Sequence, residues 1–152
     1  GVITMLMGFA MIFGYLLATE GVPAAMAEWM RAHEIGPLGV MLITALIFVL
    51  IGAVLEGAPA VLIFVPILLP VVRELDIDVV HWLTVVVLAS GIGLFVPPTG
   101  LAVLVACSVG RVSMEAIIRP LIPFLLLLAG LAVVILFPSL SIALPKAMGI
   151  PW

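Results

Sequence analysis

Charged residues are scarce in this sequence. Only 9% of its 152 residues are Asp, Glu, Lys or Arg, whereas soluble domains carry about 25%. Apolar residues make up 66%. So few charges could not cover the surface of a soluble globule, and disorder is excluded because it requires low hydrophobicity. The composition therefore predicts an integral membrane protein.

Basic residues and cysteine are scarcer still. Five Lys and Arg against eight Asp and Glu give a net charge of −3, so nucleic-acid binding has no electrostatic basis. The single cysteine, Cys107, excludes an internal disulfide framework and a cysteine-rich metal site. HExxH and GxSxG motifs and a pair of intramembrane aspartates are also lacking. We expect no catalytic residues and no enzyme.

Long uncharged runs divide the chain into segments. A membrane span needs about 20 apolar residues, and residues 1–18 and 120–138 satisfy this as plain transmembrane helices. The chain begins at Gly1 inside an apolar run, which suggests part of a longer chain. The first run has no basic segment before it, which disfavours a signal peptide. Residues 19–37 form an amphipathic interfacial connector, and residues 139–152 form a weakly amphipathic tail.

Residues 38–72 are too long for one span. As a single helix they would measure about 52 Å, against a hydrocarbon core of about 30 Å. The stretch Glu56-Gly57-Ala58-Pro59 interrupts the run with a charge, a glycine and a proline. The second arm, residues 60–72, has only 13 residues and includes Pro66 and Pro70. We predict a re-entrant helical hairpin, which survives at membrane depth only inside protein or beside a cavity.

Residues 79–109 are interrupted in a similar way. We predict a helix over 80–90, an unwound stretch over 91–99 and a second helix over 100–109, together one discontinuous transmembrane helix. The residues that break it are Gly91, Gly93, Pro97, Pro98 and Gly100.

Orientation follows from this topology. A hairpin that returns to its starting side places residues 19–37, 73–78 and the tail on one side, and residues 110–119 opposite. The arginine pair in 110–119 assigns that connector to the cytoplasm. Trp29 and Trp82 then fall at the outer interface.

Broken helices in a membrane are typical of secondary transporters. Helix C-terminal carbonyls favour cations and N-terminal amides favour anions. Unwound carbonyls after Ser90, with the hydroxyls of Ser90 and Thr99, are suitable sodium ligands, and Glu56 is the only carboxylate within the spans. Simpler interpretations stay open at this point: a structural kink, a helix cap at Glu56, and hydroxyls bonded to their own helices.

Three motifs resemble the large membrane subunit of the tripartite ATP-independent periplasmic (TRAP) transporters, the DctM-like family. They are Leu55-Glu56-Gly57-Ala58-Pro59-Ala60, Val65-Pro66-Ile67-Leu68-Leu69-Pro70 and Gly91-Ile92-Gly93-Leu94-Phe95-Val96-Pro97-Pro98-Thr99-Gly100. The C-terminal stretch from Arg119 to Phe124 is also similar to that family. The resemblance implies an inverted-repeat transporter, all-α, of which this chain is the C-terminal half.

The resemblance further implies an elevator-type, sodium-coupled importer of carboxylates in the bacterial inner membrane, multi-pass and in contact with lipid. Its implied partners are a small membrane subunit, a periplasmic substrate-binding protein and the N-terminal half of the same permease. Sodium is the coupling ion, and no cofactor or other metal is expected. The implied sodium ligands are Ser90, Gly91, Gly93, Thr99, Gly57 and Ala58. The implied hairpin tip is Glu56, Gly57 and Pro59, and the implied helix break is Pro97, Pro98 and Gly100.

The chain departs from the family at the hairpin tip. Many members have Asp-Ser where this chain has Glu56-Gly57-Ala58, so one hydroxyl ligand is lost. Two alternatives remain beside the sodium symporter. One is an ion-coupled transporter of another substrate class, and the other is a non-transporting membrane assembly subunit.

Overall fold

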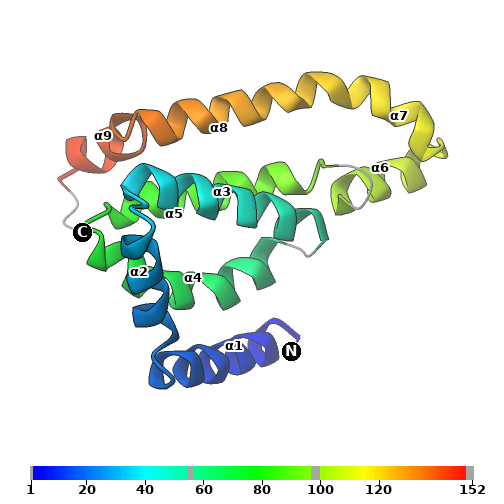
Figure 1. Ribbon diagram of the computed structural model, residues 1–152. Helices are drawn as coiled ribbons and strands as arrows, with labels where there is room; N and C mark the ends of the chain where they lie inside the picture. The colour runs from blue at the N-terminus through cyan, green and yellow to red at the C-terminus, as the bar shows by residue number, and fades with distance from the viewer. Residues whose placement is uncertain (1, 55–56, 97–99, 150–152) are drawn as a thin grey trace.

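The computed structural model describes residues 2–54, 57–96 and 100–149, and within these ranges every regular element is a helix. The helices are α1 (Val2–Thr19), α2 (Val22–Ala32), α3 (Pro37–Val54), α4 (Gly57–Glu74), α5 (Val79–Gly93), α6 (Leu101–Gly110), α7 (Met114–Leu121), the 3-10 helix η1 (Ile122–Leu125), α8 (Leu126–Leu136) and α9 (Ser139–Ala147) (Figure 1). By length and composition, α3 and the continuous helix Met114–Leu136 suffice to cross a membrane. This fold agrees with the all-α membrane protein that the sequence predicts.

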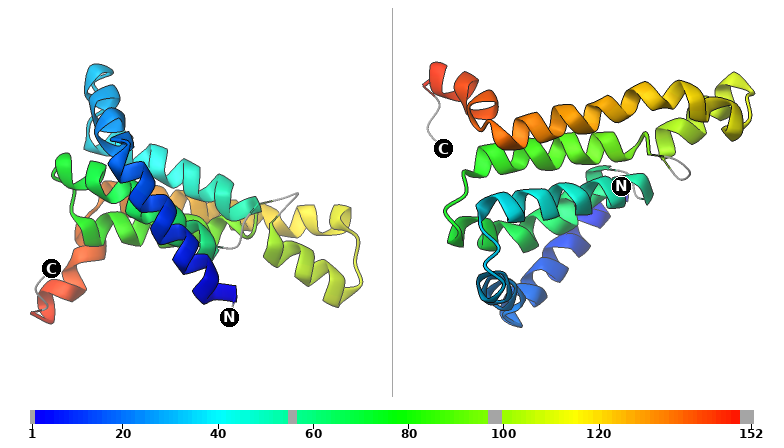
Figure 2. Two further views of the ribbon diagram at one scale, coloured as in Figure 1. Left: turned by 90° about the horizontal axis from the view of Figure 1, so that it is seen from below. Right: turned by 45° about the horizontal axis from the view of Figure 1, so that its top comes forward.

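Helices α3, α4 and α5 form the centre of the molecule. In Figures 1 and 2, α3 and α5 run in the same direction and α4 returns between their ends. Thr44 of α3 lies beside Trp82 of α5, and Gly52 lies beside Ser90 further along, as a parallel pair requires. The parallel arrangement brings the C-terminal ends of α3 and α5 together.

The second arm of the hairpin is longer than predicted. Helix α4 has 18 residues, not 13, and continues through Pro66 and Pro70. Both prolines lie on the exposed side of the helix, where Gly14 of α1 packs against Pro66, so their rings do not disturb the buried face. The arm-length argument for a re-entrant hairpin is therefore wrong, and re-entry stays a prediction that needs other support.

The last transmembrane helix also begins earlier than predicted, at Met114 and not at residue 120. Pro120 lies inside α7, and the helix changes to 3-10 geometry over η1, which includes Pro123. A short 3-10 segment re-pairs backbone groups that prolines leave without a donor. The connector between α6 and α7 is consequently only three residues, Arg111–Ser113.

The two ends of the molecule carry different connections. At one end Arg31 Nη2 donates to Glu74 Oε1 at 2.7 Å, which ties α2 to the end of α4. At that same end, His81 Nδ1 lies 3.1 Å from Ser141 Oγ, which ties α5 to α9. The α6–α7 turn lies at the opposite end (Figure 1). These connections thus lie at opposite ends of the molecule, and the membrane side predicted for each connector stays a prediction.

Trp82 lies in the protein core and not at a lipid interface. Its side chain is fully buried, and Nε1 donates a long hydrogen bond of 3.4 Å to Thr44 Oγ1. Phe48, Val85 and Val86 are buried in the same cluster. Trp29, by contrast, is exposed, as an interfacial indole should be. The predicted interface position is therefore wrong for Trp82, because α5 turns this face toward α3.

Replacing Trp82 with alanine is expected to destabilise the permease strongly. The substitution leaves a large cavity and orphans the Thr44 hydroxyl, and such core truncations cost about 3–5 kcal/mol. The apparent melting temperature of the full-length permease in detergent measures the effect. Trp29→Ala is the control and should change it little, since this side chain is largely exposed. Equal losses in both variants would contradict the assigned core.

Candidate ion site between the hairpin and the helix break

The hairpin meets α5 near the point where α5 ends. A Cβ built on Gly57, the first residue of α4, would lie 3.5 Å from the Cβ of Ser90. Ser90 itself is buried, with 4% of its surface exposed. The structure thus brings two of the predicted ligand positions together from different elements.

Two glycines allow α3 and α5 to touch through their backbones. A Cβ on Gly52 would lie 2.6 Å from the carbonyl oxygen of Ser90. A Cβ on Gly93 would lie 2.5 Å from the carbonyl oxygen of Val49 and 2.8 Å from the backbone of Gly52. Real Cβ atoms do not approach backbone so closely, so both positions require glycine. Gly93 was predicted as a ligand position, and its structural role is close approach to α3.

Helix ends set the electrostatics of this region. Helices α3 and α5 end at Val54 and Gly93, and each C-terminus carries about half a negative charge. Helix α4 begins at Gly57 and α6 at Leu101, and each N-terminus carries about half a positive charge. The region therefore presents backbone dipole ends of both signs at neighbouring points.

The Ser90 hydroxyl is bonded to its own helix. Oγ donates to the carbonyl oxygen of Val86 at 2.7 Å, which is the local bond that the sequence left as an alternative. A hydroxyl that donates its proton retains two lone pairs. Ser90 Oγ can therefore coordinate a cation through a lone pair while it keeps this hydrogen bond.

The helix break is shorter than predicted. Helix α5 continues through Gly91 to Gly93, and the residues described after it, 94–96, are not in a helix. The amides of Phe95 and Val96 donate to the carbonyls of Ile92 and Gly93, both at 3.0 Å. Those two carbonyls were expected to be free of backbone partners, and the tight turn that follows α5 occupies them.

Gly100 closes the break. Its amide donates to the carbonyl oxygen of Val96 at 2.9 Å, and a Cβ there would clash with the carbonyl of Leu94. The turn consequently needs glycine at this position, in agreement with its predicted role in the break.

Gly91 points away from the hairpin. A Cβ built on it meets no atom within 4 Å, and it lines an apolar cavity between α5 and α8 with Ile92, Gly130 and Leu131. The contacts of Gly91 therefore do not support its predicted place among the sodium ligands. Its carbonyl does belong to the last turn of α5.

Several predicted residues cannot be placed. Glu56, Pro97, Pro98 and Thr99 lie outside the described residues. Ala58 and Pro59 follow Gly57 in the first turn of α4, and Pro59 is half-buried. The hairpin tip and the helix break are therefore described only through the residues on either side of them.

Sequence reasoning missed Gly52. It stands in a helix in which most of the other residues are large and apolar, near the C-terminal end and four residues before Glu56. A glycine there costs helix stability, which is a signal of close backbone contact. The pairing with Ser90 and Gly93 could be recognised only in three dimensions.

Comparison with known proteins identifies relatives over nearly the whole chain. The chain is 34% identical over 141 residues to the C4-dicarboxylate TRAP transporter large permease protein DctM of Pseudomonas aeruginosa, covering 92% of this chain and 33% of that protein. It is 32% identical over 143 residues to the sialic acid TRAP transporter large permease protein SiaM of Vibrio cholerae, covering 93% and 33%. It is 30% identical over 139 residues to the isethionate TRAP transporter permease protein DctMQ of Oleidesulfovibrio alaskensis, covering 91% and 22%.

The chain thus spans about a third or less of the length of these curated relatives. The model of one protein family, described as the tripartite ATP-independent periplasmic transporter, DctM component, matches residues 1–140. The match includes the hairpin, the break and the helix Met114–Leu136. This chain therefore belongs to the DctM component family of the tripartite ATP-independent periplasmic transporters.

Proposed function

We propose that this chain is the part of a TRAP permease in which a sodium ion binds between the hairpin and the broken helix. Its family membership confirms the expectation of a transporter component in place of an enzyme. The observation that carries the sodium proposal is the backbone contact of Gly52 with Ser90, which holds two helix C-termini side by side. Parallel helix ends of the same partial charge repel each other, and a bound cation offsets that repulsion.

Neutral oxygen ligands favour sodium over a proton at this position. Carbonyl oxygens at the end of α3 and the Ser90 hydroxyl would supply such ligands. The carbonyls of Ile92 and Gly93 at the end of α5 accept turn hydrogen bonds, and each would coordinate the ion through its second lone pair. Thr99 and the carbonyls of Gly57 and Ala58 would complete the set, as the family resemblance implies. Closing the tip over the ion would then couple sodium binding to movement of an elevator-type transport unit.

The proposed substrate is an organic acid anion, with carboxylates as the leading class. The named relatives act on a C4-dicarboxylate, sialic acid and isethionate. The N-terminal ends of α4 and α6 would attract the negative group, since backbone amides there lack helical partners. The permease would work in the bacterial inner membrane with a small membrane subunit, a periplasmic binding protein and its own N-terminal half.

A re-entrant hairpin is part of this proposal. Gly57 lies against Ser90, close to the end of α5, while α6 continues for ten residues and packs on α7. A tip at the level of the break lies part of the way along the molecule and not at its far end. This placement supports re-entry independently of arm length.

Replacing Ser90 with alanine is expected to raise the half-saturating sodium concentration for uptake by about tenfold or more. Bonds to charged groups contribute about 1.5–3 kcal/mol, and the variant removes one oxygen ligand. Uptake would be measured in proteoliposomes containing the full-length permease and its partners, with a sodium gradient and with potassium in its place. Ser108→Ala, on the exposed surface of α6, is the matched control and should behave as wild type.

Each outcome has a distinct meaning. Uptake that persists unchanged in potassium at a fixed proton gradient would refute sodium coupling and favour another ion. A permease complex that never accumulates an organic anion under any gradient would favour the assembly-subunit alternative. An unchanged sodium requirement in Ser90→Ala, with Ser108→Ala also unchanged, would remove this hydroxyl from the ligand set.

A further inference from the structure

The last described helix, α9, packs against the beginning of α5. Ile142 of α9 is buried, and Ser141 Oγ lies 3.1 Å from Nδ1 of His81 in the first turn of α5. His81 is itself buried, with 4% of its surface exposed. Buried polar groups are held by hydrogen bonds, so this pair fixes which face of α9 is turned toward the protein.

Another face of α9 is apolar and exposed. Leu140, Leu144 and Met148 follow one another at intervals of four residues, so they lie on one side of the helix. Their exposed fractions are 59%, 68% and 65%. We call these three residues the outer stripe. The outer stripe contains only hydrocarbon and one thioether, which is a weak acceptor, so it offers a partner no strong hydrogen bond.

A third face of α9 is polar. Ser139 and Lys146 are seven residues apart, so they share one side of the helix, and both are exposed. The long stem of a lysine lets its ammonium group reach water from the edge of an apolar surface. Helix α9 thus presents separate faces to the protein, to water and to apolar surroundings.

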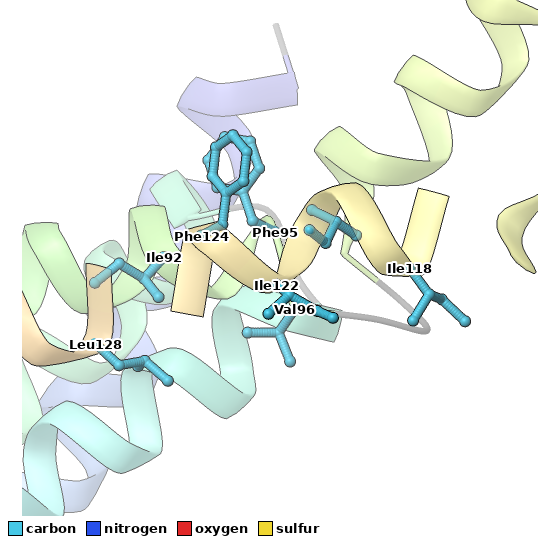
Figure 3. Close-up of a pocket in the computed structure, with 8 residues that line it drawn as sticks. Ile92, Phe95, Val96, Ile118, Ile122, Phe124 and Leu128 are labelled. Atoms are coloured by element: carbon cyan, nitrogen blue, oxygen red, sulfur yellow. The ribbon is translucent and has the colours of Figure 1, made fainter. Parts of the chain in front are cut away.

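Helix α9 directly follows a helix that is long enough to cross the membrane. Met114–Leu136 has 23 residues, which at 1.5 Å each measure about 35 Å against a hydrocarbon core of about 30 Å. Its exposed surface is apolar, as Ile122, Phe124 and Leu128 show in Figure 3. The chain turns at Pro138, and α9 leaves the line of α8 in both views of Figure 2. A helix that turns away where a complete span ends lies at a membrane boundary.

Helix α2 marks the same boundary. It lies at the same end of the molecule as α9 (Figure 1), and its Trp29 is 55% exposed. Indole side chains are favoured at the interface between membrane and water. The position of α9 along the span therefore agrees with an independent marker on another helix.

We propose that α9 is an interfacial helix whose outer stripe inserts between lipid chains at the headgroup boundary. Interfacial helices bury their apolar face at this depth and keep their polar face in water. A protein partner fits the outer stripe less well, because protein interfaces carry about one hydrogen bond per 100–200 Å². The contact between His81 and Ser141 then ties the beginning of α5 to the membrane surface. The proposed sodium site, at the other end of α5, plays no part in this inference.

Nitroxide spin labels on a full-length permease test this placement. Single cysteines at Leu140, Leu144 and Met148 would carry the label in vesicles of phosphatidylethanolamine and phosphatidylglycerol. Collisions with oxygen, which concentrates in the membrane, would be compared with collisions with a water-soluble nickel chelate. The ratio of oxygen to nickel collisions should be severalfold higher at all three positions than at Lys146. Lys146 is the matched control, because it is exposed on the same helix but on its polar face.

The measurement would be made without sodium and without substrate, so that its result does not depend on the proposed transport activity. Nickel collisions at Leu144 as frequent as those at Lys146 would show that the outer stripe faces water, and would overturn the proposal. Rare collisions with both reagents at Leu144 would show that a second copy or another protein covers the stripe, which would also overturn it. Equal ratios at every labelled position would contradict a helix that lies in the interface.

Discussion

Replacing Gly93 with valine is expected to abolish sodium-dependent uptake while the permease still inserts in the membrane. The new Cβ would lie 2.5 Å from the carbonyl oxygen of Val49 and 2.8 Å from the backbone of Gly52. Both obstacles are backbone atoms, so α3 and α5 must separate for the side chain to fit. Separation would pull apart the two helix C-termini on which the proposed ion site depends. Uptake in proteoliposomes and the amount of purified membrane protein measure the two effects.

Gly91→Val on the same helix is the matched control for Gly93→Val. No atom lies within 4 Å of a Cβ at Gly91, so most uptake should remain. The sequence predicted the same roles for both glycines, in the helix break and among the sodium ligands, and only the structure separates them. Normal uptake in Gly93→Val would show that the α3–α5 contact is not needed for transport. Loss in both variants would indicate that Gly91 is covered by a partner or by the rest of the permease.

Single cysteines placed along the hairpin are expected to react with impermeant reagents from one side of the membrane only. Cysteines at Gly36, just before α3, and at Arg73, in the last turn of α4, should react with impermeant reagents from one side of the membrane only. A cysteine at Ser113, in the α6–α7 connector, should react only from the other side. A cysteine at Val54, near the tip and 74% exposed, should react poorly from that other side. A charged reagent does not reach apolar surface at membrane depth.

Val54 is the decisive position, because Gly36 and Arg73 share a side whether the hairpin re-enters or spans. Rapid labelling of Val54→Cys from the Ser113 side would show that α3 crosses the membrane completely. The test would use right-side-out and inside-out vesicles, with each single-cysteine variant in the full-length permease. Gly36 and Arg73 reacting from opposite sides would overturn the hairpin itself.

Local composition was enough for the arrangement of helices along the chain. Long uncharged runs predicted the membrane setting, and Gly-Pro clusters predicted where α3 ends and where α5 gives way to α6. The prolines led to wrong predictions of helix boundaries, because the surroundings of each proline decided whether its helix continued. Pro66 and Pro70 face outward on α4, and Pro120 is followed by a 3-10 turn, so both helices continue. The length of α4 and the start of α7 could not be predicted for that reason.

The sequence by itself determined that this is an all-helical membrane protein with two interrupted segments, since apolarity and backbone-breaking residues act locally. Only the tertiary structure decided which faces are buried: Trp82 against Thr44, Gly93 against Gly52, and Gly91 toward an apolar cavity. The physical reason is that these helices are apolar on nearly every side. In a soluble helix the polar face reveals the buried one, but lipid and protein core select the same side chains. The faces are therefore distinguished by fit between backbones, which depends on residues far apart in the sequence.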